Sequence, residues 1–257
     1  MTLAIRDVHK WFGGQHVLRG VDLTVEAGEF VSLIGHSGCG KSTLLNVIGG
    51  LVRADAGEAL VDDMPISGPG PDRAMVFQSY SLLPRLSLEA NVREAVRSAR
   101  RDKPKAWGDE MTERYLTAVG LWEHRHKKPH EVSGGMAQRA AVARAFAVGP
   151  RILLLDEPFG ALDALTRARL QGQLVELWGN ESDTETVVMV THGIDEAVFL
   201  ADRVVVMANP PFPSVRAVLD VPIDRPRDRV AIAKHPAFEH VQAELMAILS
   251  EDALAAA

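Results

Sequence analysis

The stretch that decides the fold of this 257-residue chain runs Gly35-His36-Ser37-Gly38-Cys39-Gly40-Lys41-Ser42. It fits the pattern Gly-x-x-x-x-Gly-Lys-Ser/Thr, in which glycines let main-chain N–H groups turn inward around a phosphate. Residues 30–34 before it are apolar except for Ser32, as in a buried strand, and residues 42–51 after it favour a helix. We therefore expect a phosphate-binding loop between a strand and a helix of an α/β fold.

The side chains at the end of this stretch fit nucleotide chemistry. Lys41 can bridge the β- and γ-phosphates, and the Ser42 hydroxyl can ligate Mg²⁺. A glycine-rich turn followed by a chance Lys-Ser is the alternative, but the flanking strand and helix disfavour it. The candidate residues for binding the nucleotide are Gly35, His36, Ser37, Gly38, Cys39, Gly40, Lys41, Ser42 and Thr43.

A second motif follows the apolar run 152–155, which ends in Asp156 and Glu157. We expect Asp156 to hold Mg²⁺ through water and Glu157 to polarise the attacking water. Standing alone, the pair would be two solvated acids at the end of a strand. Its position downstream of a phosphate loop favours the catalytic interpretation.

A third motif, Ser133-Gly134-Gly135, opens a helical run. By itself it predicts only a helix cap. Main-chain N–H groups and a hydroxyl at a helix start also form an anion cradle, however, and the phosphate loop already supplies one complete cradle. A second cradle indicates a phosphate that is held from both sides.

The three motifs, in this order, resemble those of the ATP-binding cassette (ABC) ATPases, and the resemblance covers about residues 3–221. It implies ATP and Mg²⁺ as ligands. It also implies an α/β fold: a P-loop NTPase (RecA-like) core with an antiparallel β subdomain and an inserted α-helical subdomain. On this pattern residues 1–84 and 141–221 form the core with its β subdomain, 85–140 form the helical signature subdomain, and 222–257 form a C-terminal helical tail.

The resemblance also assigns roles to single residues. Phe12 matches the aromatic side chain that stacks on adenine, with Trp11 as the neighbouring candidate. Gln78 matches the glutamine that senses Mg²⁺ and the transport partner, and His192 matches the histidine at the γ-phosphate. Residues 160–163 match the loop that crosses between subunits. The expected catalytic residues are therefore Glu157, His192 and Gln78, and the expected metal ligands are Ser42, Gln78 and Asp156.

In this family the catalytic unit is a head-to-tail dimer, which implies that one chain carries two half-sites. ATP would bind between the phosphate loop of one subunit and the Ser133-Gly134-Gly135 segment of a second copy or of a related ATPase. The family's usual signature reads Leu-Ser-Gly-Gly-Gln, whereas this chain has Val132 and Met136 at its ends. Methionine removes a polar side chain near the ribose and leaves the cradle intact.

A narrower resemblance links residues 68–84 to the uptake systems for nitrate, sulfonate, taurine, cyanate and bicarbonate. It implies a peripheral subunit on the cytoplasmic face of the inner membrane, bound to integral membrane permease subunits and served indirectly by a solute-binding protein. The alternative is a soluble, non-transport cassette ATPase acting on ribosomes, DNA or iron–sulfur assembly. A P-loop kinase or simple nucleotide switch would leave the Ser133 segment without a role.

Composition also bears on the possible partners and on the cellular compartment of the protein. The net charge of −6 argues against a nucleic-acid partner, and the single cysteine, Cys39, excludes an intrachain disulfide. No uncharged apolar run approaches the roughly 20 residues that span a bilayer. Cys39 lies near a helix start, where a lowered pKa is possible, but we expect simply a small residue beside the phosphates. Residues 225–229 are expected to be a solvated charge run, and 237–249 a terminal amphipathic helix.

Overall fold

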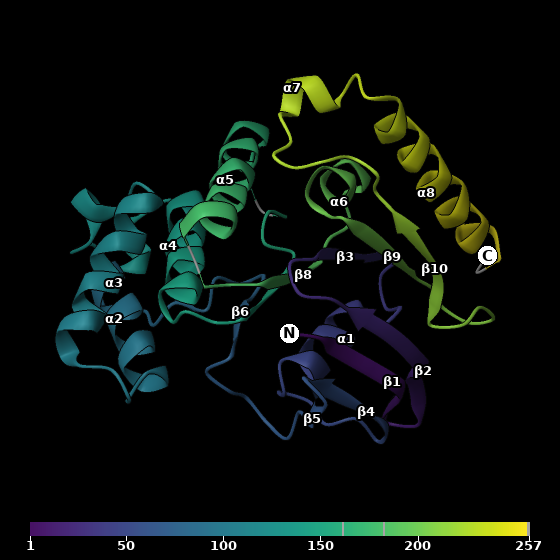
Figure 1. The fold of residues 1–257 in the computed structure, drawn as a ribbon, viewed down its shortest axis with the longest axis horizontal. Helices are drawn as coiled ribbons and strands as arrows, with labels where there is room; N and C mark the ends of the chain where they lie inside the picture. The colour runs from purple at the N-terminus through teal and green to yellow at the C-terminus, as the bar shows by residue number, and fades with distance from the viewer. Residues whose placement is uncertain (161, 182, 256–257) are drawn as a thin grey trace. The chain divides into compact units, whose positions relative to one another are not determined.

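The computed structural model describes residues 1–160, 162–181 and 183–255. The chain forms two compact units, one of Met1–Pro69 with Thr186–Ala257 and one of Gly70–Glu185 (Figure 1). The first unit holds the phosphate loop, and the second holds the acidic motif and the Ser133 segment. The subdomain boundaries expected from the family pattern remain predictions.

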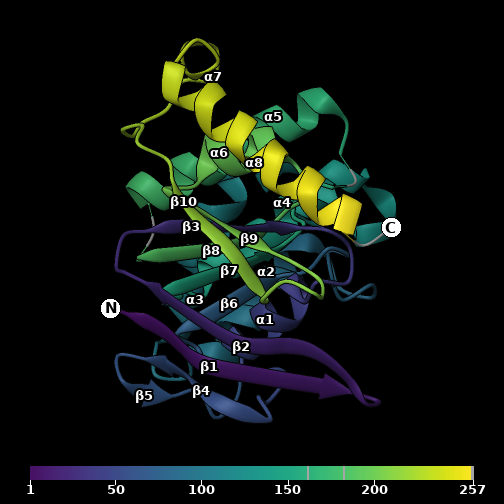
Figure 2. The ribbon, with the colours of Figure 1, turned by 90° about the vertical axis from the view of Figure 1, so that its right-hand side faces the viewer.

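The first unit is built on β-structure (Figure 2). One antiparallel sheet has the strand order β2-β1-β4-β5, and strands β10, β9, β3 and β8 are neighbours in a second sheet. Strand β3 pairs in parallel with both β8 and β9, while β10 pairs antiparallel with β9. The strands are β1 (Leu3–Phe12), β2 (Gln15–Val25), β3 (Phe30–Gly35), β4 (Ala56–Val61), β5 (Met64–Pro65), β8 (Thr186–Val190), β9 (Arg203–Met207) and β10 (Val215–Asp220).

Burial explains why the parallel strands have continuous apolar sequences. Every residue of β3 and β8 is buried, as expected when a parallel sheet is covered on both faces. The predicted buried strand before the phosphate loop is thereby confirmed. The helices of this unit are α1 (Lys41–Ile48), α6 (Ile194–Leu200), α7 (Arg229–Ile232) and α8 (Pro236–Ala255).

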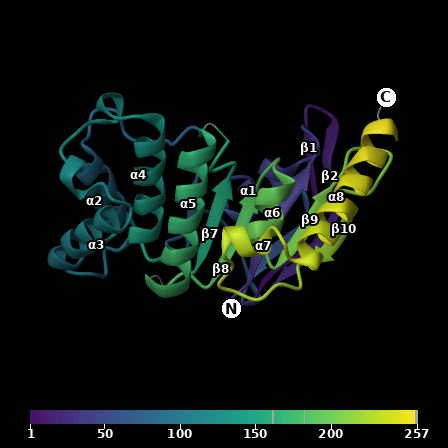
Figure 3. The same cartoon turned by 90° about the horizontal axis from the view of Figure 1, so that it is seen from above.

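The second unit combines a parallel pair of strands with a group of helices. Strand β6 pairs in parallel with β7, and helices α2, α3 and α4 pack against one another (Figure 3). Two short 3-10 helices lie between α3 and α4. The elements are β6 (Arg73–Val76), α2 (Leu88–Ala99), α3 (Lys105–Ala118), 3-10 turns at Trp122–His124 and Pro129–Glu131, α4 (Gly134–Ala147), β7 (Ile152–Asp156), α5 (Ala164–Glu176) and a π-helical turn at Leu177–Glu181.

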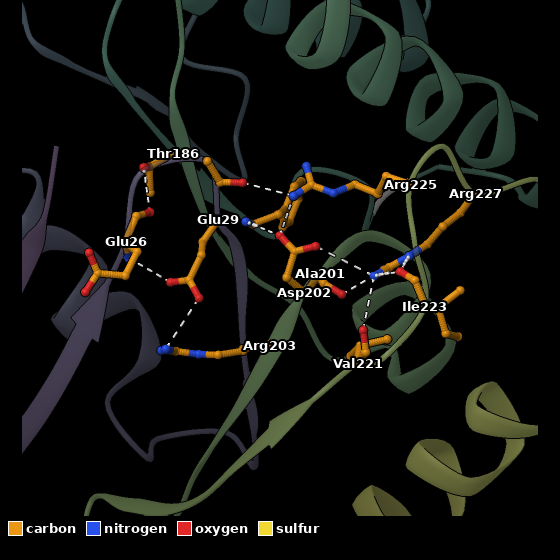
Figure 4. A network of polar contacts seen from close by, with 12 residues as sticks. Glu26, Glu29, Thr186, Ala201, Asp202, Arg203, Val221, Ile223, Arg225 and Arg227 are labelled. Carbon is orange, nitrogen blue, oxygen red and sulfur yellow. Dashed lines mark hydrogen bonds and ion pairs between the residues drawn. The ribbon is translucent and has the colours of Figure 1, made fainter.

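Residues 225–229 were predicted to be a solvated charge run, and this prediction is wrong for the central residue, Arg227. The Arg227 side chain is only 3% exposed and pairs with Asp202 (Figure 4). Its guanidinium donates to the carbonyls of Val198, Phe199 and Ala201, at 3.2, 3.2 and 2.7 Å. These carbonyls end α6, where a helix leaves acceptors without intrahelical donors. Arg227 is buried because it caps a helix end. The charged residues around it in the sequence predict solvent exposure and do not indicate this role.

The C-terminal helix α8 lies beyond the last strand of the first unit (Figure 3). It packs on α6, and its buried side chains include Val241 and Leu245. The predicted terminal helix is confirmed and is longer than expected, since it runs from Pro236 to Ala255. Within the part of the chain that the structure describes, no helix is long and apolar enough to cross a membrane.

Candidate nucleotide-binding site

The phosphate loop leaves β3 at Gly35 and enters α1 after Gly40. Both glycines have positive φ, of 152° and 102°, which other residues rarely adopt. A Cβ on Gly35 would lie 2.1 Å from the Met207 carbonyl oxygen, and one on Gly40 would lie 2.8 Å from Leu18 Cδ2. The loop therefore depends on glycine for conformation and for space, as a main-chain anion cradle requires.

Lys41 sits at the first position of α1 and is 5% exposed. Its ammonium donates to the carbonyls of Gly35 and His36, at 2.8 and 3.0 Å, so it curls back over the loop. Ser42 and Thr43 follow in the first helical turn and are partly exposed. An ammonium in this position can exchange carbonyl oxygens for the phosphate oxygens of a nucleotide.

Cys39 lies inside the same loop and is 1% exposed. Burial raises the pKa of its thiol above the ordinary value, and the nearby Lys41 charge opposes this only in part. A buried neutral thiol is a small apolar side chain rather than a reactive nucleophile. The structure thus favours the expected packing role over oxidation chemistry.

The aromatic candidates for the base differ in their surroundings. Trp11 stacks on His16, with ring centroids 4.0 Å apart and planes 10° apart. Phe12 ends β1, is 49% exposed and has the Lys10 ammonium 5.2 Å from its ring centroid. Because the Trp11 ring is already stacked within the protein, Phe12 is the better candidate for adenine.

His192 lies in the short turn between β8 and α6, and its side chain is exposed. The preceding Thr191 is buried, and its hydroxyl forms a short hydrogen bond with Glu196 and accepts one from the Gly193 N–H at 3.0 Å. These bonds hold the turn on both sides of His192. Thr191 and Glu196 are supporting residues that no sequence motif singled out.

In the second unit the structure brings two expected catalytic residues together. The Gln78 amide nitrogen donates to a Glu157 carboxylate oxygen at 2.9 Å. Glu157 directly follows Asp156, the last residue of β7, and has a positive φ of 47°. A non-glycine residue in this region costs about 1–3 kcal/mol, a strain typical of functional sites. The Gln78 side-chain nitrogen donates to Glu157, and an amide nitrogen is not a metal ligand. The side-chain oxygen of Gln78 is therefore the atom suited to ligate a cation.

The Ser133 segment begins α4, and the Ser133 hydroxyl caps the helix by accepting from the Met136 N–H at 3.3 Å. A Cβ on Gly134 would lie 2.9 Å from the Tyr80 hydroxyl, and one on Gly135 would lie 2.7 Å from Thr166 Cγ2. Neither glycine has a positive φ. Here a Cβ would force neighbouring side chains to shift, and Ser133 and Gly134 remain exposed.

Sequence reasoning missed the residues that support this second half-site. Arg144 donates to the carbonyls of Tyr80 and Ser81, two residues of positive φ just after Gln78. Gln138, 1% exposed in α4, donates to the Pro158 carbonyl at 2.6 Å. Polar residues spaced among the alanines of α4 were the available signal. The crossing loop at 160–163 includes residue 161, which lies outside the described residues, while Asp163 caps α5.

The candidate metal ligands offer a hydroxyl, an amide oxygen and a carboxylate, a donor set that suits Mg²⁺. Ser42 belongs to the first unit, and Gln78 and Asp156 belong to the second. The described residues contain no cluster of three histidine, cysteine or acidic side chains that could hold a metal on their own.

A protein-family model described as ABC transporter matches residues 18–160. The nitrate import ATP-binding protein NrtD of Synechococcus elongatus is 47% identical over 232 residues, covering 90% of this chain and 84% of that protein. The nitrate transport protein NasD of Klebsiella oxytoca is 48% identical over 235 residues, covering 91% and 89%. The bicarbonate transport ATP-binding protein CmpC of S. elongatus is 45% identical over 256 residues, but this chain spans only 38% of its length.

The fold also matches solved structures. The dimeric structure of MJ0796, a bacterial ABC transporter cassette, has a TM-score of 0.74 and 31% identity, covering 86% of this chain and 100% of that one. A dimeric post-hydrolysis state of the same cassette, bound to ADP and Pi, has a TM-score of 0.73. These likenesses confirm the expected P-loop NTPase core with its antiparallel β and α-helical parts.

Proposed function

Because the chain belongs to the ABC transporter family, we propose that it is the ATP-hydrolysing subunit of a membrane importer for a small anion. The observation that carries the hydrolytic part is the 2.9 Å contact between Gln78 and Glu157. It holds a strained carboxylate beside the one side chain that the family pattern links to both metal and transport partner. The relatives named for nitrate and bicarbonate transport support an oxyanion as cargo.

The chain's own residues divide the chemistry of hydrolysis. Lys41 and the main-chain N–H groups of the phosphate loop bind the phosphates, and Phe12 stacks on the base. Glu157 accepts a hydrogen bond from the attacking water and orients it, while His192 contacts the γ-phosphate. Ser42, Gln78 and Asp156 would hold Mg²⁺, which would neutralise charge on the phosphates.

The exposed Ser133 segment completes the proposed site from a second subunit. Its hydroxyl and helix N-terminus form an anion cradle that is open to solvent in the single chain. ATP then joins two subunits head to tail, and loss of the γ-phosphate releases them, which converts a local charge change into rigid-body motion. The partner is a second copy or a related ATPase.

The motion requires a membrane partner if the protein drives transport. We propose that the subunit is peripheral, on the cytoplasmic face of the membrane, and binds integral permease subunits. A solute-binding protein delivers the solute to those permease subunits. The segment after Gln78 supports this role, because Tyr80 and Ser81 have strained backbones and Leu83 is 51% exposed. A strained, apolar surface segment next to a metal-sensing residue is suited to receive a partner.

One experiment tests transport directly. A tagged chain is purified from membranes of its own cells in mild detergent, and copurifying proteins are identified. In parallel, uptake of nitrate and bicarbonate is compared between cells with the normal chain and cells with Glu157→Gln. We expect a copurifying permease and loss of uptake of one anion. Association with ribosomes or DNA, or normal uptake of both anions in the variant, would contradict the proposal.

A further inference from the structure

The far end of the C-terminal helix α8 meets the phosphate loop. Nε2 of His36 lies 2.8 Å from the main-chain carbonyl oxygen of Leu249, 213 residues later in the chain. A carbonyl only accepts hydrogen bonds, so Nε2 must carry the proton and donate. Both residues belong to the first unit, and α8 can be followed as the yellow helix in Figure 2.

The helix end of this bond is held firmly. Leu245, one turn before Leu249, is fully buried, which fixes this part of α8 on the unit. Arg216 of β10 pairs with Glu251 at 3.3 Å and with Asp252 at 3.5 Å, so the last turns of the helix are tied to the sheet. The Asp252 carboxylate is 3% exposed and faces Arg216 without a hydrogen bond, so Arg216 offsets the charge of a buried carboxylate.

The loop end of the bond reaches the residue that binds phosphate. The carbonyl of His36 accepts from the Lys41 ammonium at 3.0 Å, while its ring donates to Leu249. The Asn209 amide adds a contact to the neighbouring Ser37 carbonyl at 3.5 Å. His36 therefore contacts both the helix, through its ring, and the lysine, through its main-chain carbonyl.

We propose that α8 is an arm of the nucleotide site, and that His36 is a positioning residue that holds the phosphate loop in its nucleotide-binding shape through Leu249. A cradle of N–H groups binds phosphate tightly only if those groups already converge, since ordering the loop on binding would weaken the affinity. The inference rests on nucleotide binding and does not depend on transport or cargo. It gives a role to the C-terminal segment that follows the ATPase motifs.

The primary test compares ATP affinity and steady-state kinetics of the full chain and two variants. His36→Ala removes the bond, whereas His36→Gln keeps an N–H donor near the same place. Loss of one hydrogen bond predicts ATP affinity about 2- to 10-fold weaker in His36→Ala. We expect KM to rise by that factor with kcat nearly unchanged, and His36→Gln to recover most of the affinity.

A second comparison shows whether the effect passes through α8. Leu245→Ala loosens the helix, and His240→Ala, at an 81% exposed side chain of the same helix, is its matched control. We expect Leu245→Ala to weaken ATP binding like His36→Ala, with no further loss when both are combined. If Leu245→Ala does not fold, as judged by its melting temperature, the two His36 variants decide the matter.

Three results would overturn the inference. The first is unchanged ATP affinity in His36→Ala, and the second is tighter binding, which would make α8 an inhibitor of the site. The third is a His36→Gln variant as weak as His36→Ala, which would mean that the imidazole itself, and not its hydrogen bond, matters. Normal ATP binding by all variants leaves the ATPase assignment intact, so the two proposals fail separately.

Discussion

The chain contains two glycine-rich segments that we propose as anion cradles, and they differ in how glycine serves them. In the phosphate loop, Gly40 has a φ of 102°, so the backbone itself requires a residue without a side chain. In the Ser133 segment, Gly134 and Gly135 lack positive φ but have Tyr80 and Thr166 too close for a Cβ. The first segment is a loop whose backbone conformation needs glycine, and the second is a helix start whose glycines lie close to neighbouring side chains.

The two segments also differ in how far each is enclosed within one chain. The phosphate loop already encloses its lysine, which is 5% exposed and donates to two carbonyls of the loop. Ser133, by contrast, caps its own helix and faces solvent. An exposed cradle contributes to binding only when another surface brings a phosphate to it.

The largest expected effect comes from Gly40→Ala, which tests the conformational requirement of the phosphate loop. The substitution combines backbone strain with a Cβ 2.8 Å from Leu18 Cδ2. Strain of about 3 kcal/mol corresponds to about 100-fold weaker ATP binding, measured by calorimetry on the purified chain. Gly38→Ala is the control, because φ there is 84° with no atom within 4 Å of a Cβ, and we expect a smaller loss. Normal ATP affinity in Gly40→Ala would refute the strained-loop explanation.

A smaller effect is expected from Gly135→Ala, which tests the requirement for space in the other cradle. Forcing a methyl group against Thr166 costs about 1–3 kcal/mol, so ATPase activity should fall about tenfold or more. ATP binding by the single chain should not change, because the phosphate loop is untouched.

The matched variant is Thr166→Ser, which deletes the Cγ2 atom 2.7 Å from the added Cβ and keeps the hydroxyl. The double variant should regain most of the ATPase activity lost by Gly135→Ala. If Thr166→Ser restores nothing, the glycine is required for contact with another molecule and not for space within this chain.

The smallest effect concerns the thiol of the phosphate loop. Because burial raises the pKa of Cys39, alkylation by iodoacetamide should be slower than for a free cysteine and should accelerate only at higher pH. The stability linked to this group is complete below the pKa of an unfolded cysteine and falls as pH rises above it. Labelling in the folded protein as fast as in urea would show that the loop opens readily.

Local patterns predicted much of the fold. The strand before the loop, the helix after it and the acidic end of β7 were all readable, because a buried strand and a helix start have strong short-range signals. The family resemblance assigned catalytic roles to Gln78 and Glu157 separately, and the hydrogen bond between them was not predicted, since 79 residues separate the two.

Contacts between distant segments could not be predicted. Arg227 stands in a charged run that predicts solvent exposure, but its guanidinium caps α6 from 26 to 29 residues away. The bond between His36 and Leu249 joins segments whose proximity depends on how α8 packs. Periodicity and motifs describe neighbours along a chain, whereas the contacts of Arg227 and His36 depend on neighbours in space.

The central claim is that each active site combines the phosphate loop of one subunit with the Ser133 cradle of another. Lys41→Ala disables the loop and leaves the cradle intact, whereas Ser133→Arg blocks the cradle and leaves the loop intact. Each variant alone should be almost inactive, although Ser133→Arg should bind ATP normally.

Mixing these two inactive variants tests the claim most directly. Half of the dimers formed at random contain one of each chain, and each such dimer has one intact composite site. We predict that the mixture regains about a quarter of the normal ATPase activity if the sites act independently. A mixture no more active than its separate components would contradict the account and place each complete site within a single chain.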